Sequence, residues 1–199
     1  MKYPDNILEL SRLAIDYMGF IFYEKSPRWV GNLSPEILKT LPQNIQKVGV
    51  FVNPSETEIL EKTEKYDLQV VQLHGSESPQ CCRFIKNHGI KIIKAFSINN
   101  ETDLETINSY TEVCDYFLFD TKTPQYGGSG QKFDWKILEK YTGKIPFFLS
   151  GGIGLEDIPT IKQIQHKQLY GIDLNSRLEV RPGLKDIALL KTKLYAANK

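Results

Sequence analysis

The chain has 199 residues, a formal net charge of +1 and a pI of about 7.6. Its lysines and glutamates are scattered without a basic stripe, which argues against a nucleic-acid-binding protein and favours small-molecule chemistry. No apolar run approaches the roughly 20 residues that span a bilayer, and no signal-peptide pattern follows Met1, so we expect a cytoplasmic protein without membrane contact.

A helix comes first, because Pro4-Asp5 is a helix-start signal and Ile7, Leu10 and Ala14 follow at helical spacing. Seven apolar runs of strand length come after it. They are continuous rather than alternating, which is typical of parallel strands buried on both faces. The runs are Tyr17–Phe22, Val48–Val52, Leu68–Leu73, Ile90–Phe96, Tyr116–Phe119, Pro146–Leu149 and Leu169–Leu174.

Helical segments separate most of these runs. Ser34-Pro35 and Ser78-Pro79 each place a capping hydroxyl before a proline at the first helical position, and Gly89 suits a C-terminal cap. The other segments expected to be helical are approximately Ser55–Tyr66, Glu101–Ser109, Phe133–Tyr141, Leu155–Ile164 and Gly183–Ala197. No linker divides the chain, so we expect one domain over residues 1–199.

Alternating strands and helices indicate an α/β fold, but a (β/α)8 TIM barrel and an open doubly wound sheet share that alternation. Polar and glycine residues after most strands favour the barrel, where all of them converge on one mouth. These residues are Lys25-Ser26-Pro27-Arg28, Asn53, His74-Gly75, Asp120, Gly151-Gly152 and Asn175-Ser176. Since the pattern begins with a helix and has seven strands, we expect a TIM barrel that lacks strand 1.

Several short motifs also occur in a specific order along the chain. They are Gly19-Phe20-Ile21-Phe22, Lys25-Ser26-Pro27-Arg28, Gln72-Leu73-His74-Gly75 with Glu77, Phe119-Asp120, Gly127-Gly128-Ser129-Gly130, Phe133-Asp134-Trp135, Ser150-Gly151-Gly152-Ile153, and Gly171-Ile172-Asp173 leading to Glu179, Pro182-Gly183 and Lys185-Asp186. Together this set resembles the phosphoribosylanthranilate isomerase family of tryptophan biosynthesis, over essentially the whole chain.

The resemblance implies an aldose–ketose isomerase with an eight-stranded barrel that uses no cofactor and no metal. Its reaction is the Amadori rearrangement of N-(5-phosphoribosyl)anthranilate to 1-(2-carboxyphenylamino)-1-deoxyribulose 5-phosphate. That chemistry needs an acid at the ring oxygen, a base at C2 and a site for the phosphate. Two alternatives stay open: a catalytically inactive barrel that binds a phosphate ligand, and another phosphosugar barrel enzyme.

The resemblance assigns the general acid to Asp120, which ends an apolar strand; an ordinary carboxylate that caps a loop is the alternative. Arg28 matches a residue that binds the anthranilate carboxylate, unless it is a solvated loop arginine. His74 and Asp173 are the other candidates for substrate binding. His74 can shape the pocket or polarise the substrate, and Asp173 can hold the substrate amine, although both can equally be structural residues.

Glycine-rich loops predict the phosphate site, because their backbone amides are unobstructed donors. The candidates are Gly128, Ser129, Gly130, Gly151, Gly152, Asn175 and Ser176. Glycines also serve simply to turn the chain, and the loop 127–130 is alternatively a lid that excludes water. Arg177 stands where many relatives have glycine, and its charge can also meet a phosphate.

The base that the resemblance implies is a cysteine, followed by glycine, at the end of a first strand. Met1 stands where the residue after that Cys-Gly is expected, so the sequence contains neither this strand nor this cysteine. The other thiols are Cys81 and Cys82, expected on an outer helix, and Cys114, expected at the opposite rim; none is placed to replace it.

Two explanations are open for this difference. The one we favour is a start at Met1 that is internal to a longer protein; the other is a protein that truly lacks its base. For the 199-residue form we expect severely reduced isomerase activity and an unpaired gap in the barrel.

Overall fold

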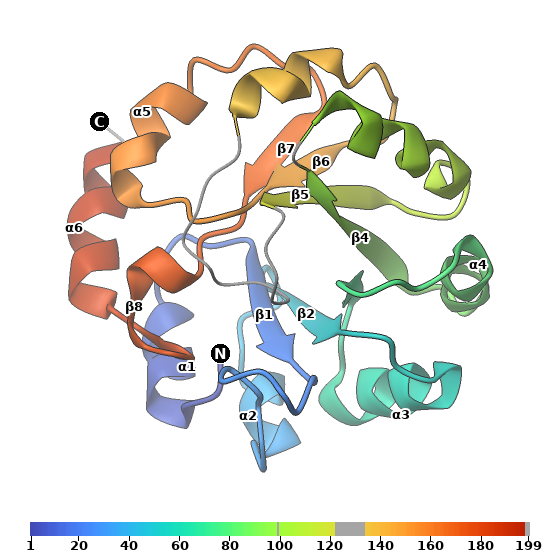
Figure 1. Ribbon diagram of the computed structural model, residues 1–199. Helices are drawn as coiled ribbons and strands as arrows, with labels where there is room; N and C mark the ends of the chain where they lie inside the picture. The colour runs from blue at the N-terminus through green and yellow to red at the C-terminus, as the bar shows by residue number, and fades with distance from the viewer. Residues whose placement is uncertain (99, 122–133, 198–199) are drawn as a thin grey trace.

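The computed structural model describes residues 1–98, 100–121 and 134–197 (Figure 1). Seven parallel strands form one sheet in chain order: β1 (Tyr17–Ile21), β2 (Gln46–Phe51), β3 (Val70–Leu73), β4 (Lys91–Ile98), β5 (Tyr116–Thr121), β6 (Phe147–Leu149) and β7 (Leu169–Ile172). The sheet curls on itself with helices outside it, so the fold is α/β and TIM-barrel-like. A doubly wound sheet would reverse its strand order, and this one does not.

The two edges of the curled sheet are β1 and β7. Among the described strands, β1 pairs only with β2 and β7 pairs only with β6, while Ile21 of β1 also makes an isolated parallel bridge with Trp29. The Tyr17 and Tyr170 hydroxyls lie 3.1 Å apart and connect the two edges at the amino-terminal ends of the strands. The expected gap in the barrel therefore lies between β1 and β7.

Helices cover the outer face of the sheet. The α-helices are α1 (Pro4–Leu10), α2 (Pro35–Lys39), α3 (Glu56–Tyr66), α4 (Pro79–Asn87), α5 (Ile158–Ile161) and α6 (Ile187–Ala197). The predicted cap at Ser78 is confirmed, because its hydroxyl accepts a hydrogen bond from the backbone N–H of the third helical residue. The capping bond predicted for Ser34 is wrong, since that side chain makes none, whereas Ser55 caps α3 in the same way as Ser78 without having been predicted to. Gly89 follows α4 with φ of 76°, a left-handed conformation that suits glycine.

Two expected helices are 3-10 helices instead, η1 (Glu101–Tyr110) and η2 (Trp135–Lys140), and a third begins with the 3-10 turn η3 (Leu155–Asp157) before α5. A further 3-10 turn, η4 (Ser176–Leu178), was not predicted. In η1 the hydroxyls of Thr106 and Ser109 donate to the carbonyl oxygens three residues before them. These side-chain bonds compete with the backbone pattern of an α-helix and explain the tighter turn. Phe133, the expected start of another helix, lies outside the described residues.

The prediction of a helix over Gly183–Ala197 is wrong in its first part. Strands β8 (Glu179–Arg181) and β9 (Leu184–Lys185) form an antiparallel hairpin, and α6 begins only at Ile187. Gly183 has φ of 82°, so Pro182-Gly183 makes the hairpin turn rather than a helix start.

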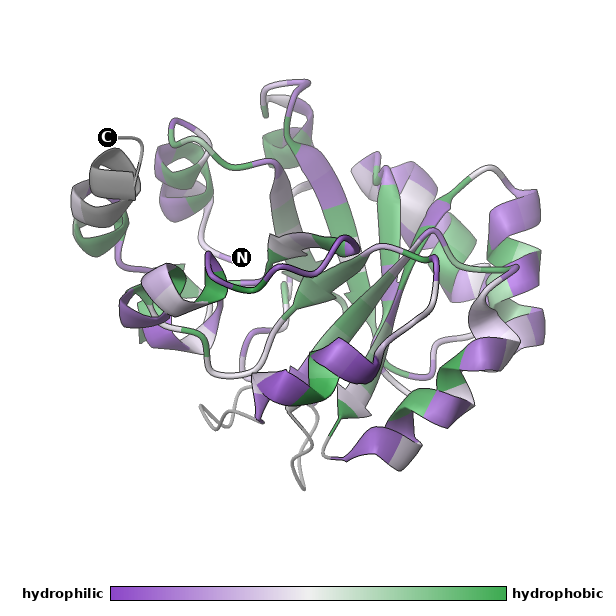
Figure 2. Ribbon diagram, turned by 90° about the horizontal axis from the view of Figure 1, so that it is seen from above, coloured by the Kyte–Doolittle hydropathy of each residue, from purple (hydrophilic) through white to green (hydrophobic). Residues whose placement is uncertain are grey.

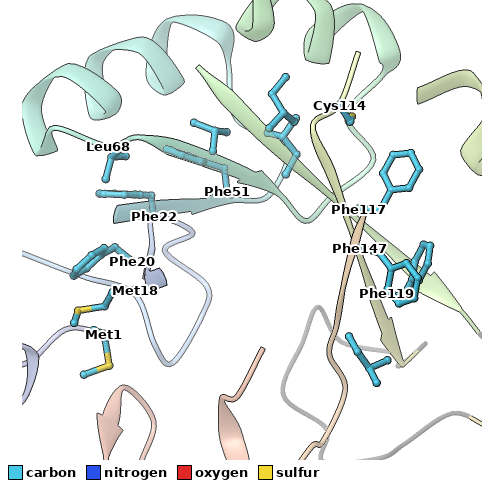
Figure 3. Close-up of a cluster of buried hydrophobic side chains, with 14 of the residues drawn as sticks. Met1, Met18, Phe20, Phe22, Phe51, Leu68, Cys114, Phe117, Phe119 and Phe147 are labelled. Carbon is cyan, nitrogen blue, oxygen red and sulfur yellow. The ribbon is translucent and has the colours of Figure 1, made fainter. Parts of the chain in front are cut away.

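The core has two layers separated by the sheet. The outer layer lies between strands and helices and includes large side chains at most 1% exposed, among them Phe20, Phe51 and Phe117 (Figure 3). The inner layer fills part of the barrel with Val48, Val70, Ile93, Ala95, Leu118 and Phe148. Figure 2 shows the apolar strands between helices whose residues alternate in polarity. Among the described helices, none combines the length and apolarity needed to cross a bilayer.

Burial along β1 differs from the expected continuous pattern. Met18 and Phe20 are buried in the outer layer, whereas Tyr17, Gly19 and Ile21 are only half-buried. The three half-buried residues line a cavity inside the barrel, so the inner face of this edge strand is not covered by core side chains.

Candidate active site

A cavity of about 800 Å³ lies inside the barrel and runs along β1. Its middle is apolar, with Val48, Val50 and Leu118 in the wall. Polar side chains stand at the carboxyl ends of the strands, where a barrel brings its loops together. Four of the residues predicted from the sequence line the cavity: Arg28, His74, Asp173 and Asn175.

Asp120 lies two residues after Leu118 in β5, so both side chains point to the same face of the sheet. Leu118 lines the cavity, and Asp120 therefore lies on the inner face. It is buried, and its Oδ2 lies 3.3 Å from Nε2 of His74. On the other side of the imidazole, Nδ1 lies 3.2 Å from the Gln72 amide nitrogen, which is only a donor. His74 therefore accepts at Nδ1 and directs the proton on Nε2 toward Asp120.

Arg28 forms a buried ion pair with a residue of the β8–β9 hairpin. Its Nε and Nη2 lie 2.8 Å and 2.7 Å from Oε2 of Glu179, whose side chain is 3% exposed. The other oxygen, Oε1, accepts from the Gly183 backbone and lies 3.5 Å from Nζ of Lys185. The hairpin thus holds one edge of the guanidinium and leaves other N–H groups for a ligand.

Lys185 connects this pair to the loop after β7. Its Nζ donates to the carbonyl oxygens of Leu174 and Asn175, at 3.1 Å and 3.0 Å, and to Oδ1 of Asn175 at 2.8 Å. Burial lowers the pKa of the lysine, and the Glu179 carboxylate opposes that shift. Both Lys185 and Arg28 therefore bring positive charge to this side of the cavity.

Asp173 follows β7 and lines the same cavity as Lys185. Ser150 donates to its Oδ2 at 3.3 Å, and its backbone N–H donates to Leu149. Desolvation raises the pKa of Asp173; Lys185 opposes this, and Asp120 adds to it. The carboxyl group of Asp120 is therefore close enough to contribute to the raised pKa of Asp173.

The other candidates for phosphate binding lie away from the cavity wall or outside the described residues. Gly151 and Gly152 follow β6 with φ of 96° and 63°, conformations that favour glycine. Ser176 begins η4. Within the described part of the chain, the cavity wall does not include Asp120, Gly151, Gly152 or Ser176. Gly128, Ser129 and Gly130 lie outside the described residues.

Arg177, whose charge could also meet a phosphate, pairs instead with Glu156 on the surface. Its Nη2 lies 2.7 Å from Oε1 of Glu156, and both side chains are about half exposed. It is not among the described residues that line the cavity. This surface ion pair accounts for the side chain without a phosphate.

None of the three cysteines lines the cavity. Cys81 and Cys82 lie on α4, outside the barrel, as expected, and Cys82 and Cys114 are buried in the core. Desolvation raises the pKa of Cys81 to about 11, so its thiol is protonated near neutral pH.

Two functional side chains were found in the sequence only as parts of a motif, with no role. These are Glu179 and Lys185, which hold Arg28 and Asn175. Their signal in the sequence is weak, since nothing near either residue shows that it is buried, and Glu179 pairs with Arg28 across 151 positions. The turn at Pro182-Gly183, which brings both strands of the hairpin together, was the available clue.

Comparisons with known proteins agree with this geometry. The family model described as "N-(5'phosphoribosyl)anthranilate (PRA) isomerase" matches residues 2–195. The N-(5'-phosphoribosyl)anthranilate isomerase of Parabacteroides distasonis is 47% identical over 193 residues, which cover 96% of this chain and 87% of that protein.

Two crystal structures of phosphoribosyl anthranilate isomerase superpose over 100% of this chain. That of the Thermotoga maritima protein has a TM-score of 0.85 at 34% identity, with 94% of its own chain covered. The second, in complex with reduced 1-(o-carboxyphenylamino)-1-deoxyribulose 5-phosphate, has a TM-score of 0.82 at 30% identity, with 95% covered. With its strand order, its cavity and its sequence in agreement, the chain belongs to the N-(5'-phosphoribosyl)anthranilate isomerase family.

Proposed function

We propose that this protein catalyses the Amadori rearrangement of N-(5-phosphoribosyl)anthranilate in tryptophan biosynthesis, in the cytoplasm. The observation that carries the proposal is the arrangement of one cavity. His74, Arg28 and Lys185 line it. His74 follows β3 and pairs with Asp120 of β5, which lies beside the wall, and the two cations stand toward the edge between β1 and β7. Two cations gathered on one side of the cavity and a carboxyl–imidazole pair suit a ligand that joins an anionic group to a sugar.

Asp120 is the proposed general acid. In the first step the bond between C1 and the ring oxygen breaks, the oxygen takes the electron pair and the Asp120 proton, and the nitrogen lone pair forms a C1=N bond. The aspartate is then a carboxylate. The N–H of His74 at 3.3 Å stabilises that charge, so the imidazole acts at the moment when the acid has given up its proton.

In the second step C2 loses its proton, the C2–H electron pair forms a C1=C2 bond, and the C1=N electron pair returns to nitrogen. The resulting enol becomes the C2 ketone as C1 gains a proton and the C2 hydroxyl loses one. This step requires a base at C2. All three thiols of this sequence lie away from the cavity wall, so we propose that none of them accepts this proton. If so, replacing Cys81 with serine leaves turnover unchanged, because the thiol is outside the barrel.

Arg28 and the loop after β7 are the proposed ligands of the two anions. Glu179 occupies Nε and one hydrogen of Nη2, so the guanidinium keeps donors for the anthranilate carboxylate. Asn175, whose side chain and carbonyl are held by Lys185, lies with Ser176 on the loop after β7. We assign the phosphate to this loop together with the backbone amides of Gly151 and Gly152 in the loop after β6.

Product formation from N-(5-phosphoribosyl)anthranilate tests the assignment. The variant Asp120→Asn keeps the shape of the side chain and removes its acid, so we expect kcat to fall by about 10²–10⁴-fold with little change in KM. Asp16→Asn is the matched control, since Asp16 lines the cavity at the opposite ends of the strands. Equal losses in the two variants would contradict the assignment. Binding of the product without any turnover by the parent would instead identify the inactive ligand-binding barrel.

A further inference from the structure

A buried ion pair on the outer side of the sheet has no part in the chemistry proposed above. Lys94 of β4 and Glu77 of the loop after β3 are 3% and 2% exposed, and Nζ lies 3.2 Å from Oε2. Lys94 faces the helices, since its neighbours Ile93 and Ala95 belong to the inner core. A buried ion pair of this kind adds little stability compared with an apolar pair, so stability alone does not explain it, and its contacts suggest another role.

The ammonium group of Lys94 holds the backbone on both sides of His74. It donates to the carbonyl oxygens of Leu73 at 3.2 Å and Gly75 at 2.9 Å, which precede and follow the histidine. A third bond goes to the Ala95 carbonyl at 3.0 Å. The direction in which the chain leaves β3, and with it the direction of the imidazole, is therefore fixed by one charged group.

The Glu77 carboxylate completes this arrangement from the other side of the loop. It accepts from the backbone N–H of Gly75, at 3.0 Å and 3.1 Å for its two oxygens, and from that of Asn53 at 2.8 Å. The loop has no room to move toward Asn53, because a Cβ at Gly75 would lie 2.5 Å from Oδ1 of Asn53. The Tyr110 hydroxyl also holds the Glu77 carbonyl at 2.9 Å.

From these contacts we propose that Glu77 and Lys94 are positioning residues that hold His74 in its hydrogen bond with Asp120. The proposal rests on the proposed function for its catalytic consequence, but not for its structural content. The pair acts through the backbone of residues 73–75, and neither side chain lines the main cavity. It forms instead part of the wall of a smaller cavity of about 310 Å³ beside the loop, where Lys94 is one of the lining residues.

The test uses Lys94→Met and Glu77→Gln, which remove the charges while keeping the lengths of the side chains. We expect kcat to fall about 10- to 100-fold, with KM changed less than twofold, because the bound substrate meets a misplaced His74 and Asp120. The double variant is expected to lose no more than the worse single variant, since each change breaks the same pair. Lys47→Met is the control: Lys47 pairs with Asp67 at the opposite ends of the strands.

A double-mutant cycle separates positioning from general loss of structure. In a His74→Ala background, Lys94→Met is expected to cost less than twofold in kcat, because the residue that it positions is gone. A further 10-fold loss in that background would overturn the proposal. So would a parent-like kcat in both single variants.

A measurement without turnover keeps the proposal independent of the isomerase assignment. The ¹⁵N spectrum of labelled histidine reports which imidazole nitrogen of His74 carries the proton. The parent is expected to show a single form protonated at Nε2, and Lys94→Met and Glu77→Gln an average of the two tautomers. Unchanged His74 signals in folded samples of both variants would overturn the positioning role even if the protein proved to have another activity.

Discussion

Replacing Glu179 with glutamine tests how strongly the hairpin holds Arg28. Glu179 is the partner of two cations, Arg28 at 2.7 Å and Lys185 at 3.5 Å, and all three side chains are at most 13% exposed. Glutamine keeps an acceptor for the Gly183 amide but leaves the two cations together without a counter-charge. Loss of one partner of a buried pair costs about 3–5 kcal/mol; because the acceptor remains, we expect about 3 kcal/mol.

For a domain of this size, 1 kcal/mol corresponds to about 2–4 °C in Tm, so the variant is expected to melt roughly 6–12 °C below the parent. Thermal unfolding followed by circular dichroism, together with urea titration, measures the change. Glu156→Gln is the control, because Glu156 pairs with Arg177 on the surface, where such a pair contributes less than about 1 kcal/mol. If both variants lost the same stability, the reasoning about the buried network would be refuted.

The other predictions concern charge and conformation around the cavity. Asp173→Asn should be more stable than the parent at neutral pH, because the raised pKa of Asp173 means that its ionised form destabilises the folded state. The advantage of the variant should grow as pH rises from about 3.9, which urea unfolding between pH 4 and pH 8 measures. The lowered pKa of Lys185 makes its protonated form unfavourable in the folded state, so this lysine costs the parent stability as pH falls from about 10.4. Lys185→Met cannot be protonated there and should not show that loss in urea unfolding. Gly152→Ala should cost about 1 kcal/mol or more in the same unfolding assay, because its φ of 63° strains any residue with a Cβ; a parent-like midpoint would contradict this. Cys81, with a pKa of about 11, should react with a thiol reagent at pH 8 far more slowly than a free cysteine does.

The strands could be read from the sequence because their burial is simple. Every residue of β3 is buried, so an uninterrupted apolar run was enough to identify it. Residues placed at strand ends were also predictable: the carboxyl ends of parallel strands share one mouth, and Arg28, His74 and Asp173 do meet there. The 3-10 turns of η1 were not, because its hydroxyl bonds to nearby carbonyls arise only once the turn has formed.

Partners far apart in the chain were the main thing that sequence patterns missed. Arg28 and Glu179 are separated by 151 positions, and nothing near either residue shows that the two are paired. The same holds for Lys94, whose position in an apolar run suggested neither a buried charge nor a contact with the loop that carries His74. Tertiary packing decides such pairs, so only coordinates reveal them.

Titration calorimetry with reduced 1-(o-carboxyphenylamino)-1-deoxyribulose 5-phosphate tests the central claim most directly, because binding does not depend on the base at C2. We expect one site per chain in the parent, and an affinity at least tenfold weaker in Arg28→Ala, which removes a charge-assisted contact worth about 1.5–3 kcal/mol. Absence of binding by the folded parent, or equal affinity in the two proteins, would contradict that claim.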